Sequence, residues 1–522
     1  MSLTQHGARV GLLMVLAAGL LGWLAAHTEI LFADGLRYVN QAQTIEGGAW
    51  RDGLLKSVDH PMYPLAIAMV HRGIGGEGPE AWQRAAQTAA VLAGVLLVIP
   101  LYLVALEMFG AGSAWLACLL VFAAPLTGHV FADALSESTF LLFWTWGLWT
   151  ALRFLKEGTF GWLPPTIAFG GLAYLSRPEG LLLPAALVAT LVVMPLLRST
   201  RLYWPRWWAA IGFLVVGAAC LVGPYVAIKG GLGTKPAIAR LLGTAASSPA
   251  SAVERQHVLD PNQSTSKTYA LAARAMALAV RDAVTIPLLP LALLGLVVSW
   301  PPGARARQWL LLTIIGVAAA LALIRLHATG GYCSPRHALV LSFLLIPAAA
   351  YGVHWALTTV AISGRWLGMG EGRFRAGPAV WVLVLAGFGA YYARADLAPV
   401  NEGLGAYKEA GAWLSDHVPP GSHVVDVTGW SLFYGQRTGY TFANLHEAPG
   451  DPGVRWVVVR EAHLRGPWTY CEQLRGLIGD RKPLVTFYGT HPRRQTQVYV
   501  FDRLSPPITA QSAMTPASAK RR

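Results

Sequence analysis

The sequence predicts an all-α polytopic membrane protein with about 11 transmembrane helices, followed by a small C-terminal α/β domain. Of its 522 residues, 54% are hydrophobic and only 13% are charged, against about 25% charged residues in an ordinary soluble protein. Stretches of about 17 to 25 apolar residues recur along the chain, and each is long enough to cross a hydrocarbon core about 30 Å thick as a helix. The composition therefore argues against a soluble globular protein.

The predicted transmembrane segments follow the apolar stretches in order. They are residues 10–27, 84–108, 112–128, 137–155, 160–175, 180–197, 207–226, 284–300, 308–326, 337–360 and 378–393. The first segment is interpreted as an uncleaved anchor rather than as a signal peptide, because further spans follow it. The 20 Trp residues suit such a protein, since indole rings favour the membrane–water interface.

The distribution of basic residues predicts the orientation. With the N-terminus in the cytoplasm, the predicted cytoplasmic segments hold eleven Lys or Arg residues against three acidic residues, as the positive-inside rule requires. Most of the formal net charge of +14 is therefore a signal of topology, and no nucleic-acid partner is expected. We expect a multi-pass protein of the inner (plasma) membrane with an extracytoplasmic C-terminal domain.

Three regions outside the predicted spans are long enough to carry function, and all three fall on the extracytoplasmic face. The expected organisation is a transmembrane module over residues 1–395 with external loops 28–83 and 227–283, an α/β domain over 396–505, and a disordered tail over 506–522. Helices are predicted within the loops at residues 38–50, 63–70 and 268–282. The α/β prediction rests on helices at 406–417 and 469–477 that alternate with strands at 423–427, 456–460, 484–487 and 497–501.

An aspartate follows the first predicted span, in the stretch Phe32–Tyr38. The carboxylate of Asp34 lies about one helical turn beyond the span, where it can act as a base or as a metal ligand. The alternative is an acid that only ends a helix at the interface. Later in the same loop, Asp59 and His60 precede a turn limited by proline, and the alternative for both is a solvated loop.

Two further charged clusters flank later spans on the same face. Asp133 and Glu137 begin the fourth span, and at spacing i, i+4 they would share one side of a helix whose dipole favours their ionised forms. Arg177 and Glu179 form a turn between two spans, where charged residues are costly and are usually paired or functional. The alternatives are capping acids and a contact that only shapes the turn. Together with Asp34, the clusters define a candidate cavity.

Cations are available on the same face, in the second large loop and before the tenth span. Lys235 lies in the second large loop, and Arg336 and His337 lie just before the tenth span. A lipid-linked phosphate leaving group needs such cations, because its charge develops as the bond breaks. The alternative is nonspecific attraction to anionic lipid head groups. The four cysteines form no metal-binding or disulfide pattern, although Cys333 and Cys471 would both be external and could pair.

On these residues the sequence resembles the polytopic glycosyltransferases of the GT-C class. It is similar in particular to the bacterial relatives of the dolichyl-phosphate-mannose protein mannosyltransferases (glycosyltransferase family 39) and to the lipid A aminoarabinose transferases. The resemblance covers roughly residues 10–400 and rests on the order and shared face of four features: Asp34 with Arg37 and Tyr38, the segment His60–Pro64, the segment Leu135–Glu137, and the turn Ser176–Gly180.

The resemblance implies transfer of a sugar from a polyprenyl-phosphate carrier to an extracytoplasmic acceptor, with inversion at the anomeric carbon. Asp34 matches the catalytic acid of the family's first loop and would act as general base, and Glu137 would line the same site as a second catalytic residue. The substrate-binding residues would be Arg37, Tyr38, His60, Asp133, Arg177, Glu179, Lys235, Arg336 and His337. Many relatives have two adjacent acids in the first loop, whereas Gly35 follows Asp34 here, and this departure counts against an acid pair or a metal mechanism. No metal ligands are therefore assigned, and a divalent cation is the alternative.

A transporter or flippase of lipid-linked saccharides is the competing interpretation. Such a protein is expected to place ionisable residues near the centres of several spans. Here the ionisable residues gather at the external ends of the predicted spans. The pattern therefore favours an enzyme.

Overall fold

The computed structural model describes residues 2–196, 204–231, 265–300, 305–330, 333–360, 378–466, 469–490 and 496–505. The chain divides into two compact units. The first comprises Met1–His27, Arg37–Ile74 and Arg84–Val400, and the second comprises Thr28–Leu36, Gly75–Gln83 and Asn401–Arg522. The expected tail 506–522, Lys235 and most of the expected loop 227–283 lie outside the described residues.

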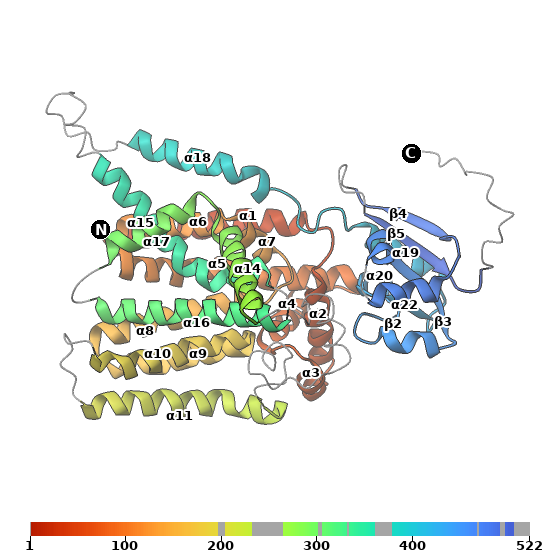
Figure 1. Cartoon of the computed structure of the whole chain (residues 1–522), viewed down its shortest axis with the longest axis horizontal. Coiled ribbons are helices and arrows are strands. Elements are labelled where there is room, and N and C mark those ends of the chain that lie inside the picture. Colours follow the sequence, from red (N-terminus) through yellow and green to blue (C-terminus); the bar gives the residue numbers. More distant parts are fainter. Residues whose placement is uncertain are drawn as a thin grey trace. The chain divides into compact units, whose positions relative to one another are not determined.

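In the first unit, the described residues of each apolar stretch singled out in the sequence form one or two α-helices. The long helices are α1 (Leu3–Ala26), α5 (Gly78–Phe109), α8 (Glu137–Glu157), α11 (Trp204–Lys229), α16 (Ala306–Gly330), α17 (Leu339–Val360) and α18 (Pro378–Asp396). Shorter ones are α6 (Ala111–Phe122), α7 (Pro125–Ala132), α9 (Leu163–Ser176), α10 (Leu182–Val193) and α15 (Leu288–Ser299). Figure 1 shows α8, α9, α10, α11 and α16 as rods that run in nearly the same direction.

The expected number of spans is not confirmed. Among the described residues, five helices are long and apolar enough to cross a membrane, or up to seven if each of two bent pairs counts as one span. The bent pairs are α6 with α7, at 65°, and α14 (Thr265–Val284) with α15, at 94°. Helices α9, α10 and α15 have 14, 12 and 12 residues, whereas a straight span needs about 20.

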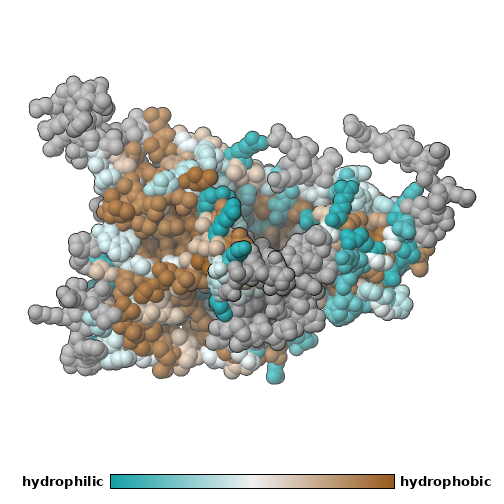
Figure 2. All heavy atoms as spheres, viewed as in Figure 1, coloured by the Kyte–Doolittle hydropathy of each residue, from teal (hydrophilic) through white to brown (hydrophobic). Residues whose placement is uncertain are grey.

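The surface of the helical unit is apolar. On the face shown in Figure 2, hydrophobic residues cover most of the surface of these helices. Large exposed side chains include Leu16 on α1, Val216 on α11, Val297 on α15 and Leu321 on α16. Soluble proteins seldom expose continuous apolar patches of this kind, so the first unit is built for a lipid environment.

Two glycines allow α15 and α17 to approach each other closely. A Cβ atom added at Gly295 would lie 1.8 Å from the carbonyl oxygen of Ala348, and one added at Gly352 would lie 2.1 Å from that of Leu291. Small residues at such crossings bring helix backbones together inside membranes. Any larger residue at either position would force the two helices apart.

Three shorter helices occupy the expected first external loop. They are α2 (Ala33–Glu46), α3 (Trp50–Lys56) and α4 (Met62–Ile74). The sequence predicts helices at 38–50 and 63–70 there, and at 268–282 in the second loop, where α14 lies. The helix prediction is therefore confirmed for these segments. Two 3-10 turns, η2 (Pro178–Leu181) and η5 (Pro335–Ala338), precede α10 and α17.

The second unit contains a five-stranded sheet with the strand order β2-β1-β3-β5-β4. Its strands are β1 (His423–Asp426), β2 (Gly439–Tyr440), β3 (Val454–Arg460), β4 (Val485–Tyr488) and β5 (Gln497–Asp502). Strand β1 pairs in parallel with β2 and β3, and β5 pairs in antiparallel fashion with β3 and β4. The expected small α/β fold is confirmed in this sheet.

The helices of this unit are α19 (Ala406–His417), α20 (Trp430–Tyr434), α21 (Glu461–Arg465) and α22 (Thr469–Ile478), with the 3-10 turn η7 (Leu445–Gly450). Leu474 and Leu477 of α22 pack on Val457 and Val459 of β3 in one buried cluster. The sequence predicts α19, α22 and four of the strands. It misses β2 and α20, which have two and five residues and are too short to show a period.

A buried histidine makes the stability of this unit depend on pH. His463 on α21 is 7% exposed, and burial, assisted by the charge of Arg460, lowers its pKa from 6.5 to about 4. Between these two values the unfolded chain binds a proton that the folded unit excludes, so stability falls as the pH falls through this window. At pH 5 the loss should be roughly 2 kcal/mol.

Pulse proteolysis of the full-length protein in urea, at pH 7 and pH 5, measures this loss. In His463→Phe the difference between the two pH values should shrink by that amount. If the stability difference between pH 7 and pH 5 were equal in His463→Phe and the unchanged protein, His463 would not be its cause.

Candidate functional site

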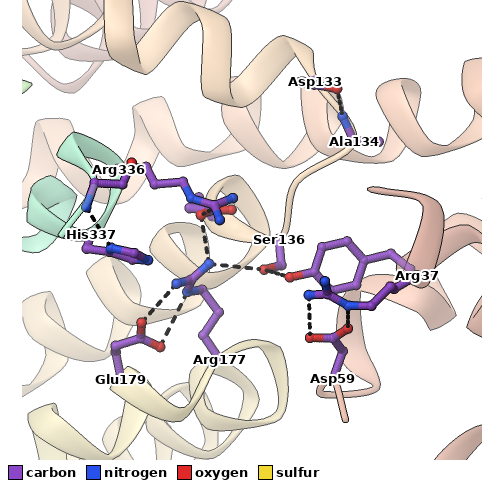
Figure 3. A network of polar contacts seen from close by, with 12 residues as sticks. Arg37, Asp59, Asp133, Ala134, Ser136, Arg177, Glu179, Arg336 and His337 are labelled. Carbon is purple, nitrogen blue, oxygen red and sulfur yellow. Dashed lines mark hydrogen bonds and ion pairs between the residues drawn. The ribbon is translucent and has the colours of Figure 1, made fainter. Parts of the chain in front are cut away.

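A network of charged and hydroxyl side chains lies where α8, η2 and η5 begin, all in the first unit (Figure 3). Its centre is Arg177, the residue that ends α9, with extended backbone at φ −153° and ψ 146°. Because this conformation interrupts the helix, the following turn η2 carries Glu179 back toward the arginine. Arg177 lies 2.9 Å from Glu179 Oε1 through Nη2 and 3.3 Å from Oε2 through Nε.

Glu137, the first residue of α8, is held between two arginines. Its Oε1 atom lies 2.7 Å from Arg177 Nη1 and 3.8 Å from Arg336 Nη1. The side chains of Glu137 and Arg177 are only 3% and 11% exposed. A buried carboxylate persists in its charged form only when it is closely paired, so the two guanidinium groups and this acid depend on one another.

A capping box holds the turn that carries Arg336. In η5 the backbone N–H of Ser334 donates to His337 Nδ1 at 3.2 Å, and the Ser334 side chain accepts from the backbone of His337. Reciprocal bonds of this kind fix the first turn of a helix. One ring nitrogen of His337 therefore accepts a hydrogen bond from the backbone of the turn that carries Arg336.

Ser136 connects this network to α2. Its hydroxyl shares a hydrogen bond of 3.0 Å with the hydroxyl of Tyr38 and accepts a longer one, of 3.4 Å, from Arg177 Nη1. The ring of Tyr38 packs edge-on against Tyr63 with ring centroids 5.2 Å apart. Sequence reasoning misses Ser136 as a site residue, because a hydroxyl that bridges two distant segments leaves no pattern in the sequence.

Arg37, which precedes Tyr38 in α2, forms a separate ion pair with Asp59. Its Nε atom donates to Asp59 Oδ2 at 2.8 Å, and Nη2 lies 3.5 Å from Oδ1. The Asp59 side chain is fully buried, whereas that of Arg37 is 49% exposed. The sequence marks Asp59 as a neighbour of His60 and does not foresee its pairing with an arginine 22 positions earlier.

His60 occupies an aromatic environment. Its ring is 5% exposed and packs edge-on against Tyr174, with centroids 5.0 Å apart, and beside Tyr225 at 5.5 Å. The structure thus brings Tyr38, Glu137, Arg177, Glu179 and Arg336 into one network. His60 contacts the rings of Tyr174 and Tyr225.

Asp133 and Glu137 do not share one side of a helix, so this expectation is wrong. Asp133 ends α7 in an extended conformation, and its Oδ1 accepts the backbone N–H of Ala134 at 2.7 Å. Aspartate side chains compete with helical hydrogen bonds in this way and break the helix. Helix α8 begins afresh at Glu137.

Asp34 lies in the first turn of α2, where the helix dipole favours a negative charge. It precedes Arg37 and Tyr38 by about one turn of the same helix. By the division of the chain it belongs to the second unit, whereas the network above belongs to the first. Lys235 lies outside the described residues.

The four cysteines are free thiols, with Cys118 and Cys471 buried. Within the described ranges, no three His, Cys, Asp or Glu side chains gather in a way that could hold a metal ion. What the network offers chemically is a set of fixed cations beside hydroxyl and carboxylate groups. Such a set suits an anionic ligand.

Comparison with known proteins gives a consistent result. Residues 59–222, about a third of the chain, match the family model described as dolichyl-phosphate-mannose-protein mannosyltransferase. The matched segment includes Asp59, Glu137, Arg177 and Glu179. No curated protein sequence matches the chain.

Solved structures match over nearly the whole chain. The oligosaccharyltransferase of Archaeoglobus fulgidus tethered with an acceptor peptide is 12% identical, with a TM-score of 0.60 over 93% of this chain and 73% of that one. The same organism's AglB with an inhibitory peptide and a dolichol-phosphate is 11% identical, with a TM-score of 0.58 over 94% and 74%. ArnT from Cupriavidus metallidurans bound to undecaprenyl phosphate is 16% identical, with a TM-score of 0.53 over 96% and 98%.

These likenesses show that the chain shares the fold of the oligosaccharyltransferase and ArnT structures. The resemblance expected from the sequence is therefore confirmed.

Replacement of Arg177 should destabilise the helical unit. In Arg177→Gln the buried carboxylate of Glu137 keeps only the more distant Arg336, and breaking a buried ion pair from one side costs about 3–5 kcal/mol. The thermal unfolding midpoint in detergent should fall clearly. In the double variant Arg177→Gln/Glu137→Gln part of the lost stability should be restored, because no uncompensated charge remains at position 137.

Lys56→Met supplies the control, because Lys56 and Asp52 form an exposed pair at spacing i, i+4 and such pairs contribute little. A midpoint for Arg177→Gln that equals the control's would contradict the interdependence of the network.

Proposed function

We propose that the chain is an integral-membrane glycosyltransferase that moves a sugar from a polyprenyl-phosphate carrier to an extracytoplasmic acceptor. The observation that carries this proposal is the family match over residues 59–222, because it covers three members of the charged network. The similar structures with bound dolichol-phosphate and undecaprenyl phosphate support a polyprenyl-phosphate donor. The acceptor is a protein, a lipid or a cell-envelope glycan.

In the proposed reaction Asp34 is the general base. Its carboxylate accepts the proton of the acceptor hydroxyl while that oxygen attacks the anomeric carbon, and the bond from this carbon to the phosphate oxygen breaks on the opposite side. A single displacement of this kind inverts the anomeric centre. Asp34 lies in the first turn of α2, where the helix dipole favours the negative charge that a base needs.

The cations have the task of stabilising the leaving phosphate. Arg336 suits this task better than Arg177, because it lies 3.8 Å from the shared carboxylate of Glu137 against 2.7 Å for Arg177. It can therefore turn toward a phosphate with a smaller loss of its attraction to Glu137. Fixed charges aimed at a developing anion are a main source of catalysis.

The remaining expected residues take supporting roles in this proposal. Glu137 lines the site and sets the positions of both arginines, and Arg37, Tyr38 and His337 contact the substrates. His60, Asp133, Glu179 and Lys235 complete the expected binding set. The proposed setting is the inner (plasma) membrane, with the N-terminus in the cytoplasm and the module 1–395 followed by an extracytoplasmic domain over 396–505.

Asp34→Asn should abolish sugar transfer by the purified protein while leaving it folded. The probe is tritiated undecaprenyl-phosphate mannose in proteoliposomes, with an extract of the host's cell envelope as acceptor, and the label is counted in the acceptor. Loss of a general base costs about 10²–10⁴-fold in rate. Asp52→Asn, in the same loop, is the matched control and should keep full activity.

An undiminished rate in Asp34→Asn would refute the assigned base. Passage of label across the bilayer without covalent transfer would instead establish a transporter.

Arg336→Gln should weaken the binding of undecaprenyl phosphate by about tenfold, the order expected for one charge-assisted contact. Retention of the lipid on immobilised protein measures this. Arg281→Gln is the control, since Arg281 pairs with the adjacent Asp282 at an exposed position. Equal affinities for the two variants would remove Arg336 from the phosphate site.

A further inference from the structure

The segment that connects α1 to α2 belongs to the unit built by the C-terminal domain. Residues 28–36, which include Asp34, join residues 75–83 and the chain from 401 onward. The part before α2 has no regular secondary structure, yet Ile30 and Leu31 are fully buried. Buried backbone groups must find hydrogen-bond partners, and here they lack those that a helix or sheet supplies.

Side chains of α20 supply partners for this backbone. The indole N–H of Trp430 donates to the carbonyl of Leu31 at 2.8 Å, and the hydroxyl of Tyr434 accepts the N–H of Leu31 at 3.1 Å. The same hydroxyl donates to Gln83 Oε1 at 2.8 Å, and Gln83 Nε2 lies 3.3 Å from the carbonyl of Thr28. Both polar groups of Leu31 are thus bound by side chains one helical turn apart.

Glu29 adds an ionic anchor. Its Oε2 accepts the backbone N–H groups of Gly403 and Gly405 at 3.0 and 2.8 Å, and its Oε1 accepts the hydroxyl of Thr490 at 2.8 Å. Asn401 donates to the carbonyl of the residue after Glu29 at 2.8 Å. Hydrogen bonds to a carboxylate are roughly twice as strong as neutral ones.

The residues that hold the segment are themselves rigid. Asp426, fully buried at the end of β1, accepts the N–H and hydroxyl of Thr428 at 2.9 and 2.7 Å and the N–H of Ser431 at 2.8 Å. These bonds fix the turn that presents Trp430, whose ring packs against Tyr407 with centroids 5.0 Å apart. A rigid scaffold is what a positioning role requires.

We propose that the C-terminal domain serves to position the N-terminal end of α2, and that Glu29, Trp430 and Tyr434 are positioning residues for Asp34. The carbonyl of Leu31 lies three residues before Asp34, and α2 begins at Ala33, so any shift of the held backbone moves the first turn of the helix. The positioning role rests on the proposed function through the base assigned to Asp34. The hold on residues 28–36, by which we mean the hydrogen bonds that fix this segment to the C-terminal domain, does not depend on the proposed function.

Hydrogen exchange of the full-length protein in lipid nanodiscs tests the hold itself. Trp430→Phe keeps an aromatic ring, although a smaller one, and removes the donor, whereas Glu29→Gln keeps the shape and removes the charge. In both variants peptides that cover residues 28–36 should exchange at least about tenfold faster, since the loss of one such bond costs about 1–3 kcal/mol.

Asp451→Asn is the matched control for these variants. Asp451 also accepts a backbone N–H, that of Gly453 at 2.7 Å, and otherwise contacts His423 and Tyr440. It is a carboxylate of the same unit that serves a different turn. Exchange of residues 28–36 in Asp451→Asn should equal that of the unchanged protein.

Transfer kinetics with tritiated undecaprenyl-phosphate mannose and the cell-envelope extract test the positioning role. Trp430→Phe and Glu29→Gln should lower kcat at least about tenfold, because small misplacements of a catalytic group are costly, while KM for the donor stays unchanged. The concentration of active sites is titrated with bound donor. A merely structural role would lower the amount of active protein and leave kcat per active site unchanged. Asp451→Asn should keep both constants.

The outcomes separate the two proposals. Unchanged exchange at residues 28–36 overturns the hold, whatever the activity. Faster exchange with an unchanged kcat overturns the positioning role. Full activity of Asp34→Asn refutes the base, and the positioning role with it, while the exchange data still decide the hold.

Discussion

The arrangement of the charged network depends on the shared carboxylate of Glu137. It begins α8, and the two arginines that contact it come from the end of α9 and from η5. Because a buried charge is tolerated only with its partners in place, this one acid ties together three segments that are far apart in the sequence. These ends of α8, α9 and η5 are therefore joined by electrostatic contacts.

The sequence predicts the charged residues of this site better than it predicts their contacts. Charge in a chain with so few charged residues is conspicuous, so Glu137, Arg177, Glu179 and Arg336 stand out against the apolar segments that surround them. The contact of Arg177 with Glu179 is among the alternatives that the sequence offers, because the two residues share one turn. The pairing of Glu137 with two arginines follows from which helix ends meet, and the i, i+4 spacing from Asp133 does not reveal it. At the end of α7 the side chain of Asp133 accepts a local backbone hydrogen bond, a kind of contact that competes with the helix.

The same holds for the fold: elements with a regular local pattern can be predicted from the sequence, and contacts between distant segments cannot. Long apolar stretches and the alternating elements of the C-terminal domain have a period that the sequence displays, and the helices and strands form there. The short α20 has none, yet it carries Trp430 and Tyr434, which bind a segment about 400 positions earlier. Contacts of this kind become visible only when the fold has brought the two segments together.

The close contact of α15 with α17 bears on the position of Arg336. The two helices meet at Gly295 and Gly352 with their backbones almost touching, and Gly352 lies 13 residues after Leu339, about 20 Å along α17. A helix locked at such a notch cannot slide along its axis. The position of the arginine along the axis of α17, relative to α15, is therefore set about 20 Å away from it, in the buried contact between the two helices.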